Sequence, residues 1–230
     1  MEPEKKSIER EIVISLFPLP TTVFYPNTDL PLHIFEPRYR QMIADALEGD
    51  GQIGMVLLKP GWENDYYGKP DIADIGCVGK IERHELLPEG KYNILLSGLH
   101  RFRVLKEIDG KSYRRARVEL LEDVNDLALS KEPSPVKDRL VERLNRYLGN
   151  LPDGKQTKEE LELETCATLA RLVDRIAYHF DLPVEQKQTF LEERDVAKRA
   201  DTLHSVIDLK IQLVELSKKF KAKGIDLSMN

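Results

Sequence analysis

The sequence predicts an α+β fold in which a β-rich N-terminal part is followed by a helical bundle. Up to about residue 125, short segments rich in β-branched residues and leucine are separated by turn residues, a pattern typical of strands. Beyond that point, apolar residues recur at helical spacing between capping residues. We therefore expect a β-domain over residues 1–125 and a helical bundle domain over residues 126–230, with the polar segment 122–133 as the linker.

Several segments of the β-rich part are predicted to form strands. They are EIVISLF (11–17), GQIGMVLL (51–58), DIGCVGKIERHELL (74–87), KYNILLSG (91–98), RFRVLKEI (101–108) and SYRRARVELL (112–121). Pro88 suits the start of a β-turn, and the pair Asp109-Gly110 suits the positive φ angles of a two-residue hairpin. We therefore expect residues 91–97, 101–108 and 112–121 to form a meander.

One amphipathic helix interrupts the strands, in the segment LPLHIFEPRYRQMIADALEGDG (30–51). Its apolar residues recur at helical spacing and form one face: Tyr39, Met42, Ile43, Ala46 and Leu47. Pro37 suits the first turn, Glu36 lies where a carboxylate meets the positive end of the helix dipole, and Gly49 ends the helix. This face is expected to pack on the sheet, so the junction needs no catalytic role to explain it.

The second part carries complete helix signals. Ser134 is a predicted N-cap with Pro135 in the first turn, and Gly149 ends that helix. Thr157 and Glu160 form a predicted capping box for a helix that reaches residue 180.

Two further helices complete the predicted bundle. Pro183 begins a short one, and a last helix over about residues 196–223 would be roughly 40 Å long at about 1.5 Å per residue. Its apolar residues lie on more than one stripe, so part of its surface is expected to contact the β-domain or another chain.

Composition limits the classes of function. The net charge is −5, from 35 basic and 40 acidic residues, which disfavours nucleic acid as the main partner. The N-terminal residues lack the features of a secretory signal peptide. No apolar run approaches the roughly 18 residues that a membrane span needs. The two cysteines, Cys77 and Cys166, lack CxxC spacing and predict reduced thiols. We expect a cytoplasmic protein with no membrane partner.

The sequence lacks the common catalytic and metal-binding motifs. The nearest approach to a phosphate-binding P-loop has Asp74 where the first glycine is required and Ile81 after the lysine. HELLP at 84–88 has Pro88 in place of the second histidine of a zinc-binding HExxH motif. Ser97 lacks the flanking glycines of GxSxG, and the five histidines show no ligand spacing. We therefore expect no catalytic residue, no metal site and no cofactor.

Four segments in order carry a resemblance to a known family. FPLPTTVFYPNTDLPLHIFEPRYRQMI (17–43), IGMVLL (53–58), DIGCVGKI (74–81) and NILLSGLHRFRV (93–104) resemble the amino-terminal domain of Lon protease, in the form found in small proteins that contain it alone. The helical segment 169–203 is similar to the part that follows in those proteins. The resemblance implies a relation to peptidase family S16 and a PUA-like β-rich pseudo-barrel joined to a helical bundle.

The resemblance also carries functional expectations. In full-length Lon this region, the LON substrate-binding domain, helps to capture unfolded or tagged polypeptides and helps assembly, while the ATPase and the Ser-Lys peptidase lie further along the chain. Those two segments have no counterpart here. The resemblance therefore implies a non-catalytic module that binds unfolded polypeptides or a protein partner through an apolar surface.

Aromatic residues are the candidate peptide-binding groups. Trp62, Tyr66 and Tyr67 lie in the polar loop KPGWENDYYGKP (59–70), where aromatic side chains can act as binding anchors. Trp62 could instead fold back onto the barrel as a plug. Phe24 and Tyr25 belong to an apolar corner that could form a shallow peptide groove or close one end of the barrel.

An RNA-binding role is the alternative, because PUA-like folds include RNA binders and residues 101–117 form a basic run. Its candidate nucleic-acid contacts are Arg101, Arg103, Arg114, Arg115 and Arg117. Strand alternation offers a simpler interpretation, in which the cations at 101 and 103 share the exposed face of a hairpin and the residues at 102 and 104 face the core. Polypeptide binding is therefore the favoured hypothesis.

Overall fold

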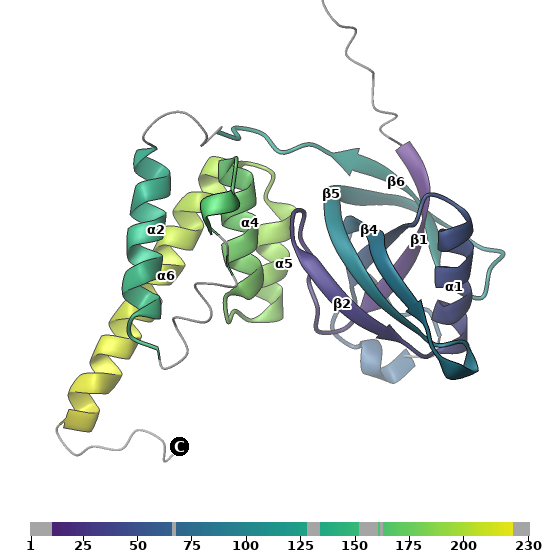
Figure 1. Ribbon diagram of the computed structural model, residues 1–230, viewed down its shortest axis with the longest axis horizontal. Coiled ribbons are helices and arrows are strands. Elements are labelled where there is room, and N and C mark those ends of the chain that lie inside the picture. The colour runs from purple at the N-terminus through teal and green to yellow at the C-terminus, as the bar shows by residue number, and fades with distance from the viewer. Residues whose placement is uncertain (1–10, 66–67, 128–133, 152–160, 162, 223–230) are drawn as a thin grey trace, which may run out of the picture. The chain divides into compact units, whose positions relative to one another are not determined.

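The computed structural model describes residues 11–65, 68–127, 134–151, 161 and 163–222. These residues divide into two compact units, so the predicted α+β class is confirmed. The β-unit holds the described residues up to Glu122 together with Leu182–Arg194, and the helical unit holds the rest. Figure 1 labels most elements of both units.

Six strands make up the sheet of the β-unit. They are β1 (Glu11–Leu19), β2 (Asp29–Ile34), β3 (Gln52–Leu57), β4 (Ile75–Leu86), β5 (Tyr92–Ile108) and β6 (Arg115–Leu121). Their order is β2-β5-β4-β3-β1-β6, and only β1 and β3 pair in parallel among them. Because β6 pairs with both β1 and β5, the strands from β5 round to β6 close into a barrel, and β2 lies along the first part of β5.

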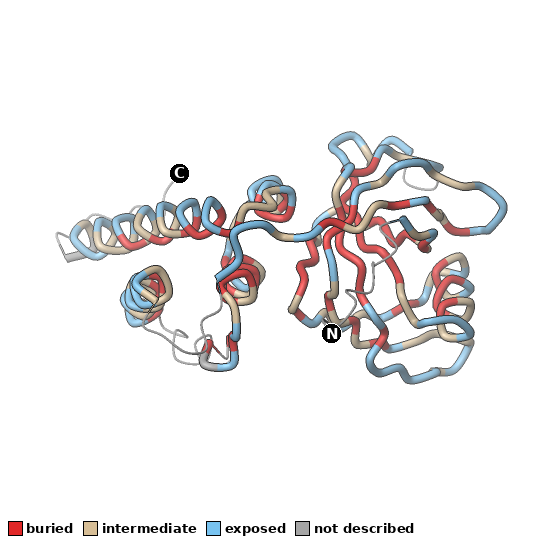
Figure 2. The backbone as a smooth tube through the Cα atoms, turned by 90° about the horizontal axis from the view of Figure 1, so that it is seen from above, coloured by how far each residue is buried: buried red, intermediate tan, exposed pale blue. Residues whose placement is uncertain are grey.

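Apolar side chains from the strands fill the barrel. The buried members of this core cluster are Ile14, Leu16, Val56, Leu58, Ile72, Val78, Phe102, Ala116 and Val118. A Cβ atom added to Gly76 would lie 2.6 Å from the ring of Phe102, so glycine is needed there to admit the ring. Figure 2 shows the buried residues in red along these strands.

Helix α1 (Pro37–Glu48) forms where the sequence predicts it. Its buried residues are Tyr39, Met42, Ile43 and Ala46, which belong to the predicted apolar face, while Leu47 is partly exposed. Glu36 makes no side-chain cap and instead pairs with Arg38 at 3.0 Å. The predicted apolar periodicity of this helix is therefore confirmed, while the interaction of Glu36 with the helix dipole stays a prediction.

The predicted meander differs from the structure at β5 and after it. Strand β5 is one continuous strand, and six residues (109–114) separate its last pair with β6, Ile108 and Arg115, in place of a two-residue hairpin. A β-bulge also interrupts β5, because Gly98 lies opposite Gly79 while His100 lies opposite Val78. Leu99 is the extra residue, and the bulge places residues 94 and 96 on the opposite face of the strand from Phe102.

Helix α5 (Val184–Glu192) packs within the β-unit, although the predicted boundary near residue 125 assigns it to the bundle. Tyr25 Oη donates a hydrogen bond to the Lys187 carbonyl at 2.6 Å, and Arg101 Nε donates to the Leu191 carbonyl at 2.9 Å. Gln188 Nε2 donates to the Ile75 carbonyl at 3.0 Å. These contacts between residues far apart in sequence explain why local signals could not place the helix.

The helical unit contains α2 (Pro135–Leu148), α4 (Leu169–His179) and α6 (Val196–Ala222). Ser134 caps α2 as predicted, by accepting a hydrogen bond from the Lys137 amide. The predicted capping box at Thr157 and Glu160 falls outside the described residues, and α4 instead begins after the N-cap Thr168.

Helix α6 is the long helix that the sequence predicts, with 27 residues. Leu203, Ile207 and Ile211 are buried, whereas Leu209, Leu213 and Leu216 are about half exposed. The apolar residues of α6 therefore lie on more than one stripe. Within the described part of the chain, no helix is both long and apolar enough to span a membrane.

Candidate functional site

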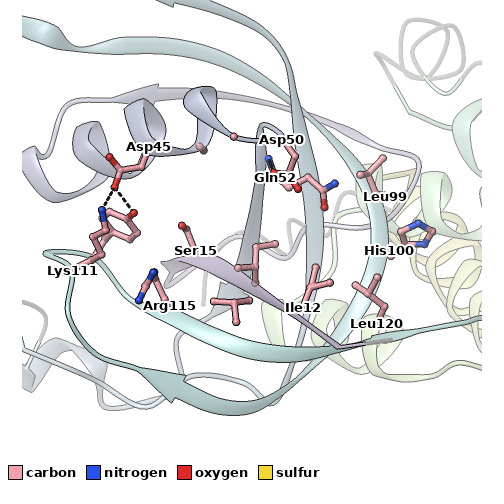
Figure 3. Close-up of a pocket in the computed structure, with 15 residues that line it drawn as sticks. Ile12, Ser15, Asp45, Asp50, Gln52, Leu99, His100, Lys111, Arg115 and Leu120 are labelled. Atoms are coloured by element: carbon pink, nitrogen blue, oxygen red, sulfur yellow. Dashed lines mark hydrogen bonds and ion pairs between the residues drawn. The ribbon is translucent and has the colours of Figure 1, made fainter. Parts of the chain in front are cut away.

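The candidate site is a pocket of about 540 Å³ in the β-unit, which we call the barrel pocket (Figure 3). Residues from β1, β6, the end of α1 and the bulge of β5 line it. Its lining residues are Ile12, Val13, Ile14, Ser15, Asp45, Ala46, Gly49, Asp50, Gln52, Leu99, His100, Lys111, Tyr113, Arg115 and Leu120. Barrel mouths are common positions for ligand sites.

One end of the barrel pocket is mostly apolar, with His100 as the polar side chain beside its leucines (Figure 3). Ile12, Leu99 and Leu120 lie together there and pack, only partly buried, against the core cluster of the barrel (Figure 3). Leu99 is the bulge residue of β5, and bulges commonly re-aim a side chain next to a site. This end can therefore accept an apolar group.

The other end is polar and is organised around Asp45 of α1. The carboxylate accepts hydrogen bonds from Tyr113 Oη at 2.6 Å and Lys111 Nζ at 2.9 Å (Figure 3), and from Gln41 Nε2 at 2.6 Å. Hydrogen bonds from Tyr113, Lys111 and Gln41, in that order, lower the pKa of Asp45 to about 2. The same carboxylate raises the pKa of Lys111. Asp45 is thus an ionised group whose acceptors are occupied.

Arg115 of β6 lies at the same end, beside Ser15 and Lys111 (Figure 3). Its Nε atom is buried and has no hydrogen-bond partner among the residues that the structure describes. Its charge is close enough to Lys111 to oppose the rise in the pKa of that lysine. The polar end therefore presents a guanidinium that no protein carboxylate neutralises within the described part of the chain.

Comparison with known proteins assigns the chain to a family. The family model of the ATP-dependent protease La (LON) substrate-binding domain matches residues 13–208. The chain belongs to this family. It is 29% identical to Lon protease 2 of Myxococcus xanthus over 207 residues, and 27% identical to Lon protease of Escherichia coli (strain K12) over 223 residues. These alignments cover 90% and 96% of this chain but only 25% and 27% of the relatives, so the chain spans about a quarter of their length.

Solved structures show the same fold. A Lon N-terminal domain protein from Xanthomonas campestris matches with a TM-score of 0.61 and 22% identity, over 84% of this chain and 98% of that one. The N-terminal domain of a Mycobacterium avium complex Lon protease matches with a TM-score of 0.61 and 17% identity, over 86% and 98%. The predicted relation to the Lon N-terminal domain and to the Lon peptidases is therefore confirmed.

Of the aromatic residues suggested by the sequence, the three that the structure describes do not line the barrel pocket of this LON-family chain. Trp62 lies in the short helix η1 (Trp62–Asp65) and packs, partly buried, against the core cluster, which fits the plug interpretation. Phe24 and Tyr25 are 1% and 0% exposed, so the structure does not support contact of either side chain with a peptide. Tyr66 and Tyr67 fall outside the described residues.

The five arginines of the alternative hypothesis do not form one cationic face. Arg101 is 1% exposed because α5 covers the strand face that alternation alone left open. Arg103 pairs with Glu119 at 3.1 Å, and two nitrogens of Arg114 bind Glu107 at 2.6 and 2.9 Å.

The two remaining arginines differ from each other. Arg117 is exposed, and Arg115 lines the barrel pocket. The basic run 101–117 thus contains Arg115 and its pocket neighbours Lys111 and Tyr113, but the sequence did not connect them with Asp45 or Leu99. Gly98 within a strand was the one available signal, because glycine inside a strand often marks a bulge.

Proposed function

We propose that this chain binds segments of unfolded polypeptides, or a protein partner, at the barrel pocket and does so without ATPase or peptidase activity. The observation that carries the proposal is the partly exposed apolar end of the pocket, formed by Ile12, Leu99 and Leu120. Membership of the LON substrate-binding domain family supports the same role.

The expected affinity is micromolar or weaker. A pocket of about 540 Å³ holds one or two side chains of a polypeptide, and binding must overcome the entropy of ordering a flexible chain. A single module also lacks the avidity that several linked sites would give.

The test is a titration of the full chain with fluorescently labelled casein, an unstructured protein, at low and high salt. Leu120→Asp, which places a charge at the apolar end, should weaken binding about fivefold or more. Leu105→Asp is the matched control, because Leu105 is 44% exposed on the same sheet and does not line the pocket. A folded Leu120→Asp variant that binds casein like the unchanged chain would refute the site.

The lack of catalysis is tested with the same substrate. The chain incubated with ATP and casein should release neither phosphate nor peptides above a blank. The reason is that this sequence contains neither a P-loop nor a counterpart of the Ser-Lys peptidase segment of Lon. Turnover that follows the protein through successive purification steps would contradict this proposal.

RNA binding is the less supported alternative. Arg101 is buried, while Arg103 and Arg114 are already paired with carboxylates, so few cations of the hairpin remain for phosphates. Binding to casein should persist in high salt, whereas binding dominated by phosphate contacts should weaken steeply. We also propose a cytoplasmic location, which the buried thiol groups of Cys77 and Cys166 support.

A further inference from the structure

The charges at the polar end of the barrel pocket are unequally matched. Asp45 accepts hydrogen bonds from Lys111, Tyr113 and Gln41, so its oxygens are already engaged. Asp50 accepts a hydrogen bond from the backbone N–H of Gln52. Among the described residues, no carboxylate lies within ion-pair distance of Arg115, and its buried Nε donates to no acceptor. Beside the engaged carboxylate of Asp45, the group that lacks a partner is therefore the Arg115 cation.

An arginine in this state is suited to a particular ligand. Its planar guanidinium donates two parallel hydrogen bonds to a carboxylate, and such charge-assisted bonds are stronger than neutral ones. The other end of the same pocket is apolar, through Ile12, Leu99 and Leu120. The two ends together match a ligand that joins a carboxylate to an apolar group.

Resting on the proposed function, we propose that Arg115 makes the barrel pocket selective for polypeptide segments in which a carboxylate lies next to an apolar side chain. The ionised Asp45 and the nearby Asp50 favour a singly charged carboxylate over a doubly charged phosphate. The carboxylate can come from a chain terminus or from an acidic side chain, because both present the same group to the guanidinium.

The experiment uses the full chain and four labelled peptides of one polar sequence. The first ends in a leucine with a free carboxylate, and the second ends in the same leucine as an amide. The third is amidated and has an internal Glu-Leu pair, and the fourth has phosphoserine in place of that glutamate. Fluorescence anisotropy measures the Kd of each peptide.

The free acid or the Glu-Leu peptide should bind about tenfold tighter than the plain amide. Arg115→Gln should abolish this difference, and Arg115→Lys should restore part of it because it keeps the charge without the planar fork. Arg117→Gln is the matched control, since it removes the same charge two residues along β6 from an exposed position outside the pocket lining. It should keep the full difference, and a thermal melt of each variant checks folding.

The outcomes separate this inference from the proposed function. Tighter binding of the free acid identifies a chain terminus, tighter binding of the Glu-Leu peptide identifies an acidic side chain, and both support the inference. Equal binding of acid, Glu-Leu and amide peptides, or preference for the phosphopeptide, would overturn it while casein binding still stands. Casein binding that does not respond to Leu120→Asp would instead remove the proposed site.

Discussion

Replacing Asp45 by asparagine should destabilise the β-unit by about 1 kcal/mol at neutral pH. The drop in the pKa of Asp45 from 3.8 to about 2 corresponds to at most about 2.4 kcal/mol, at about 1.4 kcal/mol per pH unit. The side chains of Asp45 and Lys111 are 22% and 44% exposed, so solvent screens the interaction and roughly halves that value. Asparagine keeps an acceptor for Tyr113 but loses the charge.

The pH dependence of this effect has a defined sign. The pKa of Asp45 is lower in the folded chain than in the unfolded chain, so the unfolded chain binds the proton first as the pH falls. The stabilisation is therefore fully present well above pH 3.8 and is lost as the pH falls from 3.8 to about 2. The difference in the free energy of unfolding between the unchanged chain and Asp45→Asn should therefore shrink over the same pH interval.

The assay is urea denaturation followed by tryptophan fluorescence at several pH values. Trp62 is the only tryptophan and packs on the core cluster of the β-unit, so its signal reports that unit. Asp109→Asn is the control, because the side chain of Asp109 is 96% exposed, and it should change stability by less than about 0.5 kcal/mol. The argument would be refuted if Asp45→Asn lowered the free energy of unfolding by the same amount at pH 7 and at pH 3.

Three further predictions concern stability. Trp62→Ala should lower the Tm of the β-unit by about 4–8 °C, measured by calorimetry, while casein affinity stays unchanged, because Trp62 packs on the core cluster; weaker casein binding without a Tm change would indicate an anchor instead. Gly98→Ala should cost about 1–3 kcal/mol in urea denaturation, since its Cβ would collide with the Tyr25 carbonyl oxygen, whereas Gly49→Ala meets only ordinary contacts. Arg199→Met should destabilise the helical unit by about 3–5 kcal/mol, followed by circular dichroism, because it removes a buried cation that pairs with Asp123 at 2.8 Å and lies 3.7 Å from the buried Asp174; near-neutral stability would contradict this prediction.

The elements with local signals could be predicted from the sequence. Helix α1 has a proline in its first turn, an apolar face at helical spacing and Gly49 at its end, and each signal lies within a few residues of the helix. The same holds for Ser134 at the start of α2 and for the long helix α6. The fold class followed from these elements because strands precede helices along the chain.

Features that depend on distant residues could not be predicted in this way. Helix α5 joins the β-unit through backbone carbonyls that accept hydrogen bonds from Tyr25 and Arg101, and sequence spacing does not reveal such pairs. Arg101 also shows why alternation misled. The alternation correctly places Arg101 and Phe102 on opposite faces of β5. It could not show that α5, about 90 residues later in the sequence, covers the face that holds Arg101.

The barrel pocket, like the position of α5, depends on residues that are distant in sequence. The bulge at Leu99 lets one long strand pair with β2 along its first part and with β6 along its last part, with a change of face between them. Regular pairing would leave no residue unmatched against β4, whereas the bulge leaves Leu99 at the apolar end of the pocket. Strand β6, which closes the barrel against β5, brings Arg115 to the polar end. The bulge of β5 and the closing strand β6 thus together create a site with an apolar end and a cationic end, and a sequence pattern that assumes regular strands cannot show either end.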